Sequence, residues 1–122
     1  MKLALLFLLV LAVPATPAAE EALKEVNAAR RRHGLQPYRY SKSLTAAAKR
    51  CADYRAARLM AGHTHNDFVV GRVNAPAAGC AAWKPSLGWG ACCTYDREYR
   101  HAGAAWAKGR DGRRYMHLFV RH

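Results

Sequence analysis

Residues 21–68 constrain the fold of this chain most, because they have the pattern of two helices separated by a stiff loop. In the first helix, Leu23 and Val26 recur at helical spacing. Acidic residues come early and basic residues late, the charge order that the helix dipole favours. Gly34 is suited to a position just past a helix C-terminus, and Pro37 prevents the helix from continuing. We therefore predict that the first helix ends just before Gly34.

A second helix is predicted after this loop. Ser41 or Ser43 can accept hydrogen bonds from its first free amides, and Gly62 is expected to end it. An alanine-rich face on this helix allows another element of the fold to approach closely. The residues that recur at helical spacing are Leu44, Ala47, Ala48, Cys51 and Leu59.

The C-terminal residues have the pattern of a β-hairpin, in which segments 102–108 and 113–120 flank the turn sequence Gly-Arg-Asp-Gly. The small residues at 102–105 fit a strand over which a helix packs. Because both faces of the second arm are apolar, we predict that the hairpin lies inside a covered sheet. One face carries Tyr115, His117 and Phe119, and the other carries Met116, Leu118 and Val120.

The middle of the chain is less regular. Residues 68–70 are compatible with a short strand or with the start of a helix, and the density of Gly and Pro in residues 71–93 predicts irregular structure. With helices first and a hairpin last, the pattern indicates a single α+β domain.

The N-terminus has the pattern of a secretory signal peptide. Lys2 precedes an apolar run at residues 3–13, and small residues follow near Ala18. The run is well short of the roughly 20 residues that a membrane-spanning helix needs. We predict a signal peptide at residues 1–19, a domain at residues 20–122 and a secreted, extracellular protein.

Four cysteines remain in the predicted exported domain, and an even number in a small secreted chain favours disulfides. A bond between the adjacent Cys92 and Cys93 would be strained. We therefore predict that Cys51 and Cys80 each pair with one member of this doublet. The chain has no C-x-x-C pair, which argues against a zinc site built from cysteines.

The chain is strongly basic. Its 20 Lys and Arg residues against 8 Asp and Glu residues give a formal net charge of +12 at pH 7. This surplus predicts nonspecific attraction to polyanions, which falls with added salt. The sequence has no dedicated nucleic-acid motif.

Several short motifs follow one another along residues 21–120. They are Asn27-x-x-Arg30, Gly34-Leu35-x-Pro37, Leu44-x-x-Ala47-Ala48 with Ala52, Phe68 followed by Arg72-Val73-Asn74, Trp83-x-x-Ser86, Gly103, and Ala107-x-Gly109-Arg110-Asp111-Gly112-Arg113-x-Tyr115 followed by Phe119. In their order and spacing, these motifs resemble those of the CAP superfamily of cysteine-rich secretory proteins, antigen 5 proteins and pathogenesis-related proteins.

The resemblance implies an αβα sandwich with a central antiparallel sheet, here shortened to two N-terminal helices and a C-terminal hairpin. It also implies a cleft lined by two histidines and two acidic residues, which binds a divalent metal in some members. The first cleft histidine matches His63 or His65. The second is absent, since Trp89 follows Ser86-Leu87-Gly88 at that place. The resemblance therefore predicts a degenerate cleft with the candidates His63, His65, Ser86 and Trp89.

His63 and His65 are the best candidates for chemistry. Two imidazoles at i and i+2 can bind one metal ion, such as zinc, or they can simply be solvated. Asp67 is a candidate oxygen ligand, and His101 or His117 a candidate third nitrogen.

The sequence offers little support for an enzyme, since Ser86 lacks the strained turn of a nucleophile elbow. We predict a secreted, non-catalytic binding protein, whose extracellular ligand is by resemblance a lipid, a polysaccharide or a protein. The alternatives are a metal-dependent hydrolase that uses His63 and His65, and a cationic protein that binds polyanions or membrane surfaces.

Overall fold

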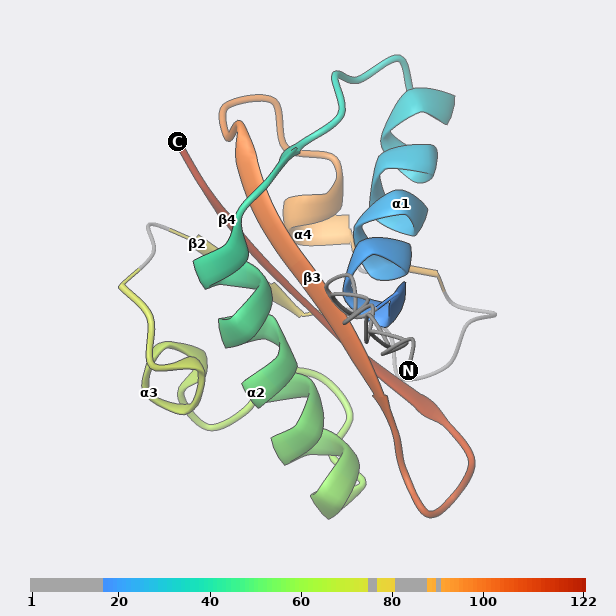
Figure 1. Ribbon diagram of the computed structural model, residues 1–122, viewed down its shortest axis with the longest axis vertical. Helices are drawn as coiled ribbons and strands as arrows, with labels where there is room; N and C mark the ends of the chain where they lie inside the picture. Colours follow the sequence, from blue (N-terminus) through green and yellow to red (C-terminus); the bar gives the residue numbers. More distant parts are fainter. Residues whose placement is uncertain (1–16, 75–76, 81–87, 90) are drawn as a thin grey trace, which may run out of the picture.

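The computed structural model describes residues 17–74, 77–80, 88–89 and 91–122. These residues form two long helices, two short helices and a four-stranded sheet (Figure 1). The helices are α1 (Pro17–Arg32), α2 (Lys42–Arg58), α3 (Asp67–Gly71) and α4 (Ala91–Thr94). The strands are β1 (Arg39–Tyr40), β2 (Ala77–Cys80), β3 (His101–Lys108) and β4 (Arg114–Arg121).

The two long helices are those that the sequence predicts. α1 ends before Gly34, which adopts a left-handed φ of +70°. Ser41 caps α2, because its hydroxyl accepts a hydrogen bond of 3.3 Å from the Leu44 amide. The predicted end of α2 at Gly62 is wrong: the helix stops earlier, because Leu59 takes the left-handed conformation (φ 51°) and its amide bonds back to carbonyls of the last turn.

The predicted C-terminal hairpin is also present, and it forms the centre of the sheet. The strand order is β1-β3-β4-β2, with β1 parallel to β3 and the other pairs antiparallel. His101 lies opposite Arg121 at the open end of the hairpin, and Lys108 lies opposite Arg114 near its turn. Residues 68–70, for which the sequence allowed either a short strand or the start of a helix, belong to the short helix α3.

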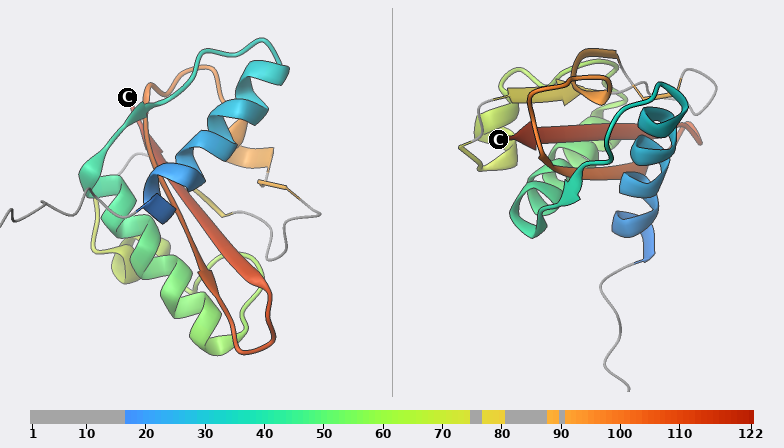
Figure 2. Two further views of the ribbon diagram at one scale, coloured as in Figure 1. Left: turned by 45° about the vertical axis from the view of Figure 1, so that its right-hand side comes forward. Right: turned by 90° about the horizontal axis from the view of Figure 1, so that it is seen from above.

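The sheet is covered on both faces, as Figures 1 and 2 show. Met116 and Leu118 of β4 pack with Val26 of α1 on one face, and Phe119 packs with Leu44 of α2 on the other. The alternation predicted for β4 therefore divides the core into two layers. The fold is an α+β, three-layer αβα sandwich.

The predicted signal peptide falls largely on residues 1–16, which lie outside the described residues. No helix in the described ranges is both long and apolar enough to span a membrane. Export of the chain stays a prediction from the sequence.

Candidate functional site

A buried polar cluster lies between α2, α3 and β4. Asp67 is the first residue of α3 and follows Asn66, whose side chain caps this helix. The Asp67 carboxylate turns back into the preceding loop, where its Oδ1 accepts hydrogen bonds from the Thr64 amide (2.9 Å) and the Thr64 hydroxyl (2.6 Å). These bonds fix the carboxylate, so that its other oxygen faces the sheet.

That second oxygen faces two histidines. Oδ2 of Asp67 accepts a hydrogen bond from Nδ1 of His63 and lies 3.6 Å from Nε2 of His117. The His63 side chain is half exposed, at 51%, whereas His117 is completely buried. Because 3.6 Å is too long for a hydrogen bond, Nε2 of His117 has no hydrogen-bond partner among the described residues.

The other ring nitrogen of His117 faces Arg55, a buried residue of α2. The guanidinium Nη1 lies 3.5 Å from Nδ1 of His117 and also donates a hydrogen bond to the Met116 carbonyl. A guanidinium can only donate, so Nδ1 is the acceptor and the neutral ring carries its proton on Nε2. The Nε2–H group therefore points at Asp67 without reaching it.

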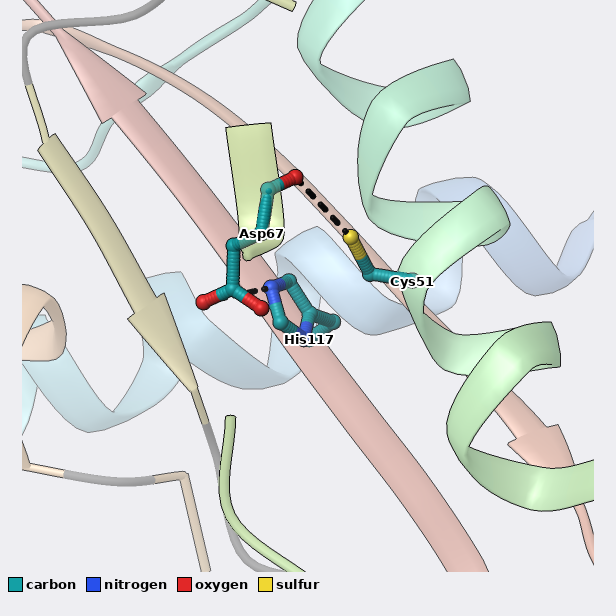
Figure 3. A group of neighbouring side chains, drawn as sticks. All are labelled: Cys51, Asp67 and His117. Carbon is teal, nitrogen blue, oxygen red and sulfur yellow. Dashed lines mark hydrogen bonds and ion pairs between the residues drawn. The ribbon is translucent and has the colours of Figure 1, made fainter. Parts of the chain in front are cut away.

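Cys51 completes the cluster from α2. Its buried thiol donates to the backbone carbonyl of Asp67 at 3.5 Å, and Figure 3 shows Cys51, Asp67 and His117 converging from three different elements. One potential ligand atom of each residue lies within 4.8 Å of the other two. A sulfur, a carboxylate oxygen and an imidazole nitrogen are all ligands of zinc in proteins.

Burial and hydrogen bonding determine the protonation state of this cluster. Burial raises the pKa of Cys51 to about 12 and lowers the pKa of His117 to about 4. Burial also acts to raise the pKa of Asp67, but the hydrogen bonds from Thr64 and His63 outweigh it and lower that pKa below its usual value. At neutral pH the cluster therefore contains a neutral thiol, a carboxylate and a neutral imidazole.

The structure brings together only some of the candidates from the sequence. His63, Asp67 and His117 lie together, whereas His65 faces Tyr54, whose hydroxyl is 3.1 Å from its Nδ1. His101 is the first residue of β3, away from the cluster, and contacts the carbonyl of His122 at 3.1 Å. Ser86 lies outside the described residues.

Trp89 lies on the opposite face of the sheet from this cluster. It belongs to the core that contains Met116 and Leu118, and its Nε1–H donates to Oε2 of Glu25 at 3.0 Å. Arg114 binds both carboxylate oxygens of the same glutamate. The resemblance to the family placed Trp89 and His63 in one cleft. In the structure they lie on opposite faces of the sheet and do not share one.

The disulfide predicted for Cys51 is not present in the described part of the chain, where Cys51 has a free thiol. The physical reason is its position: Cys51 packs with Phe119 under α2, whereas Cys93 belongs to the core on the other face of the sheet. The side chains of Cys80 and Cys92 lie outside the described residues, so their pairing stays a prediction. Cys51 was not expected in a metal site, because an even number of cysteines in a predicted secreted chain favours disulfides.

A second feature is an open groove of about 600 Å³ where α2 begins beside β1 and the open end of the hairpin. Tyr40 is 46% exposed there, beside the cationic residues Lys42 and Arg121. Among its described lining residues there is no carboxylate. The full set is Tyr40, Ser41, Lys42, Ser43, Ala46, His101 and Arg121.

In the described residues, the fold and the buried cluster define a small three-layer αβα domain with a polar site under α2. The profile of the CAP family, described as the cysteine-rich secretory protein family, matches residues 23–111, and the chain belongs to this family. No curated protein and no solved structure matches the chain.

Proposed function

We propose that this chain is an exported CAP domain that binds an acidic polysaccharide outside the cell and does not catalyse a reaction. The observation that supports this proposal best is the groove at the start of α2, which combines an exposed tyrosine with Lys42, His101 and Arg121. The signal-peptide pattern and membership of a family described as secretory support export.

The groove has the chemistry that an acidic sugar polymer requires. Tyr40 offers a flat ring with a polar hydroxyl, and the two permanent cations suit carboxylate or sulfate groups. A formal net charge of +12 attracts a polyanion to the whole surface, but this attraction alone does not select one place on it. The groove provides such a place.

The buried cluster supports a binding role over a catalytic one. Cys51, Asp67 and His117 are each at most 7% exposed, so a substrate would reach only the imidazole of His63. A hydrolytic reaction needs a nucleophile and an acid or base in contact with the substrate. The hydrolase alternative therefore has weaker support than binding.

The test compares the binding of an oligogalacturonate with that of a neutral glucan of the same length, measured by calorimetry at several salt concentrations. The double variant Lys42→Ala/Arg121→Ala should weaken oligogalacturonate binding about tenfold. It should also lower the log–log salt slope by about 1–2. Tyr40→Ala should weaken binding with no change in that slope.

The matched control is Lys108→Ala/Arg110→Ala, which removes the same number of charges at the turn end of the hairpin. This control should leave the affinity within about twofold of wild type. An equal loss in both double variants would replace the groove with nonspecific attraction to a basic surface. Equal affinity for the neutral glucan would contradict recognition of acidic groups.

A further inference from the structure

The most unusual feature of the buried cluster is the imidazole of His117, which is completely buried and has no hydrogen-bond partner for Nε2 among the described residues. Buried polar atoms in native proteins nearly always have a partner, so an unpaired one calls for an explanation, such as a bound water molecule or ion. We propose that Cys51, Asp67 and His117 form a binding site for a divalent transition metal ion, with zinc as the preferred ion.

The spacing of the three residues fits this proposal. Oδ2 of Asp67 lies 3.6 Å from Nε2 of His117, and the three ligand atoms lie within 4.8 Å of one another. Bonds of about 2.0–2.3 Å to tetrahedral zinc place neighbouring ligand atoms about 3.3–3.7 Å apart. The Asp67–His117 pair already has this spacing, and the Cys51 sulfur needs to move by only about 1 Å.

The donor set selects the class of metal. Thiolate and imidazole ligands suit zinc, cobalt and their neighbours, whereas calcium and magnesium require oxygen ligands. One thiolate and one carboxylate balance the two charges of the ion, which matters because the site is buried. Arg55, which faces the other nitrogen of His117, keeps its positive charge with and without the metal.

Metal binding moves two protons. The thiol of Cys51 loses its proton to solvent and becomes the thiolate ligand. The ring proton of His117 transfers from Nε2 to Nδ1, so that Nε2 can bind the metal. Arg55 then gives up its long contact with Nδ1, at 3.5 Å, and retains its hydrogen bonds to the carbonyls of Met60 and Met116.

Thr64 and His63 hold the Asp67 carboxylate in place for this role. Oδ1 accepts the two hydrogen bonds from Thr64, and Oδ2 accepts one from His63, so the remaining lone pair of Oδ2 is available to the metal. Outer hydrogen bonds of this kind orient ligands and raise metal affinity. The half-exposed His63 marks the solvent side of the cluster, from which a water molecule can supply the fourth ligand.

This site differs from the His63/His65 pair considered from the sequence, because His65 faces Tyr54 and the new ligand set includes a thiolate. It is also independent of the groove. The groove contains neither Cys51 nor Asp67 nor His117, so either proposal can fail without affecting the other.

The experiment uses the purified full chain, freed of metal under reducing conditions and titrated with Co²⁺ and then with Zn²⁺. We expect one Co²⁺ per chain, with a near-ultraviolet sulfur-to-cobalt charge-transfer band and the visible spectrum of a tetrahedral ion, both removed by Zn²⁺. Binding of Zn²⁺ at pH 7 should release about one proton per chain, because the thiol is protonated without metal. The melting temperature should rise with the Zn²⁺ concentration.

Cys51→Ser and His117→Gln should each weaken Zn²⁺ binding at least 100-fold, and Cys51→Ser should abolish the charge-transfer band. Cys51→Ser is nearly isosteric, and near-ultraviolet circular dichroism reports whether each variant is folded. His65→Ala and Cys93→Ala are matched controls that should retain the band and the affinity, since neither residue belongs to the cluster.

A folded wild-type chain that binds Co²⁺ with no charge-transfer band would overturn the proposal. So would a loss of metal in His65→Ala with retention in Cys51→Ser, because that result would assign the metal to surface histidines. A wild-type melting temperature that is insensitive to Zn²⁺ would also overturn it.

Discussion

Gly103 of β3 lies directly against Thr45 of α2, with no room for a side chain between them. A Cβ atom placed on Gly103 would lie 1.9 Å from the backbone nitrogen of Thr45 and 2.1 Å from the carbonyl carbon of Leu44. The first turn of α2 therefore contacts the sheet through backbone atoms. This close approach positions the rest of α2, including Cys51 and Arg55, over β4.

Gly103→Ala should destabilise the domain strongly. The added methyl group meets the backbone of α2, so α2 must move away from β3 to admit it, and the packing of Leu44 is lost. We expect a loss of about 3 kcal/mol or more in the free energy of unfolding, at the upper end for overpacked cores. Urea unfolding followed by circular dichroism measures the change.

Gly71→Ala is the matched control for this variant. Its added Cβ would lie 2.9 Å from the ring of Phe119, which is a side chain and can shift. We expect a smaller cost, of about 1–2 kcal/mol. If both variants lost the same amount, the backbone contact would not be the cause.

Much of the fold could be predicted from the sequence because the local signals agree. Helical spacing, the Ser41 cap and the Gly34 terminus define the two long helices, and the two apolar faces around His117 and Phe119 predict a covered hairpin. The end of α2 could not be predicted, because Leu59 adopts a left-handed conformation that a non-glycine residue rarely takes.

The site was predictable only in part. The sequence pointed to His63, Asp67 and His117, because metal-binding side chains near one another in the chain or in the sheet can converge. The sequence did not identify Cys51 as a member of the site, because that membership depends on which face of the sheet the cysteine packs against. The position of Trp89 also depends on tertiary packing, which places it against Glu25.

Arg30 should prove essential for stability. It is 2% exposed, and its guanidinium donates to the carbonyls of Gln36 (2.7 Å), Thr94 (2.8 Å) and Asp96 (2.8 Å) while lying 3.7 Å over the Tyr38 ring. A lysine lacks the planar fork that reaches several carbonyls at once.

Arg30→Lys should therefore lower the free energy of unfolding by about 2–4 kcal/mol, since buried carbonyls lose their donors. Denaturant unfolding measures this loss. The neighbouring Arg31 is exposed, so Arg31→Lys should change stability by less than about 0.5 kcal/mol. A similar loss in both variants would contradict a special role for the carbonyl contacts of Arg30.

Trp89 should contribute to stability and not to ligand binding. Trp89→Phe keeps an aromatic ring in the core but removes the hydrogen bond to Glu25, so we expect a loss of about 1–3 kcal/mol in stability. The affinity for oligogalacturonate should remain unchanged, because Trp89 is not part of the groove. If Trp89→Phe were as stable as wild type but bound oligogalacturonate more weakly, Trp89 would instead be a ligand contact. Trp106→Phe, on the same face, is the control for the general effect of removing an indole.

Asp111 and Tyr115 should make the hairpin turn sensitive to acid. The Tyr115 hydroxyl donates to Oδ2 of Asp111 at 2.6 Å, and this bond lowers the pKa of Asp111 below its usual value. A carboxyl group whose pKa is lower in the folded state adds stability above its unfolded pKa of about 3.9, and this contribution is lost as the pH falls through the folded value. Tyr115→Phe should therefore be less stable than wild type at pH 7, and the difference should shrink below pH 4. Urea unfolding of both proteins at pH 7 and pH 3 measures it, with Asp111→Asn as the control.

In an Asp111→Asn background, Tyr115→Phe should have the same effect at both pH values. A wild-type difference that stays constant from pH 7 to pH 3 would show that Tyr115 stabilises the turn through its packing against α2, independently of the charge on Asp111.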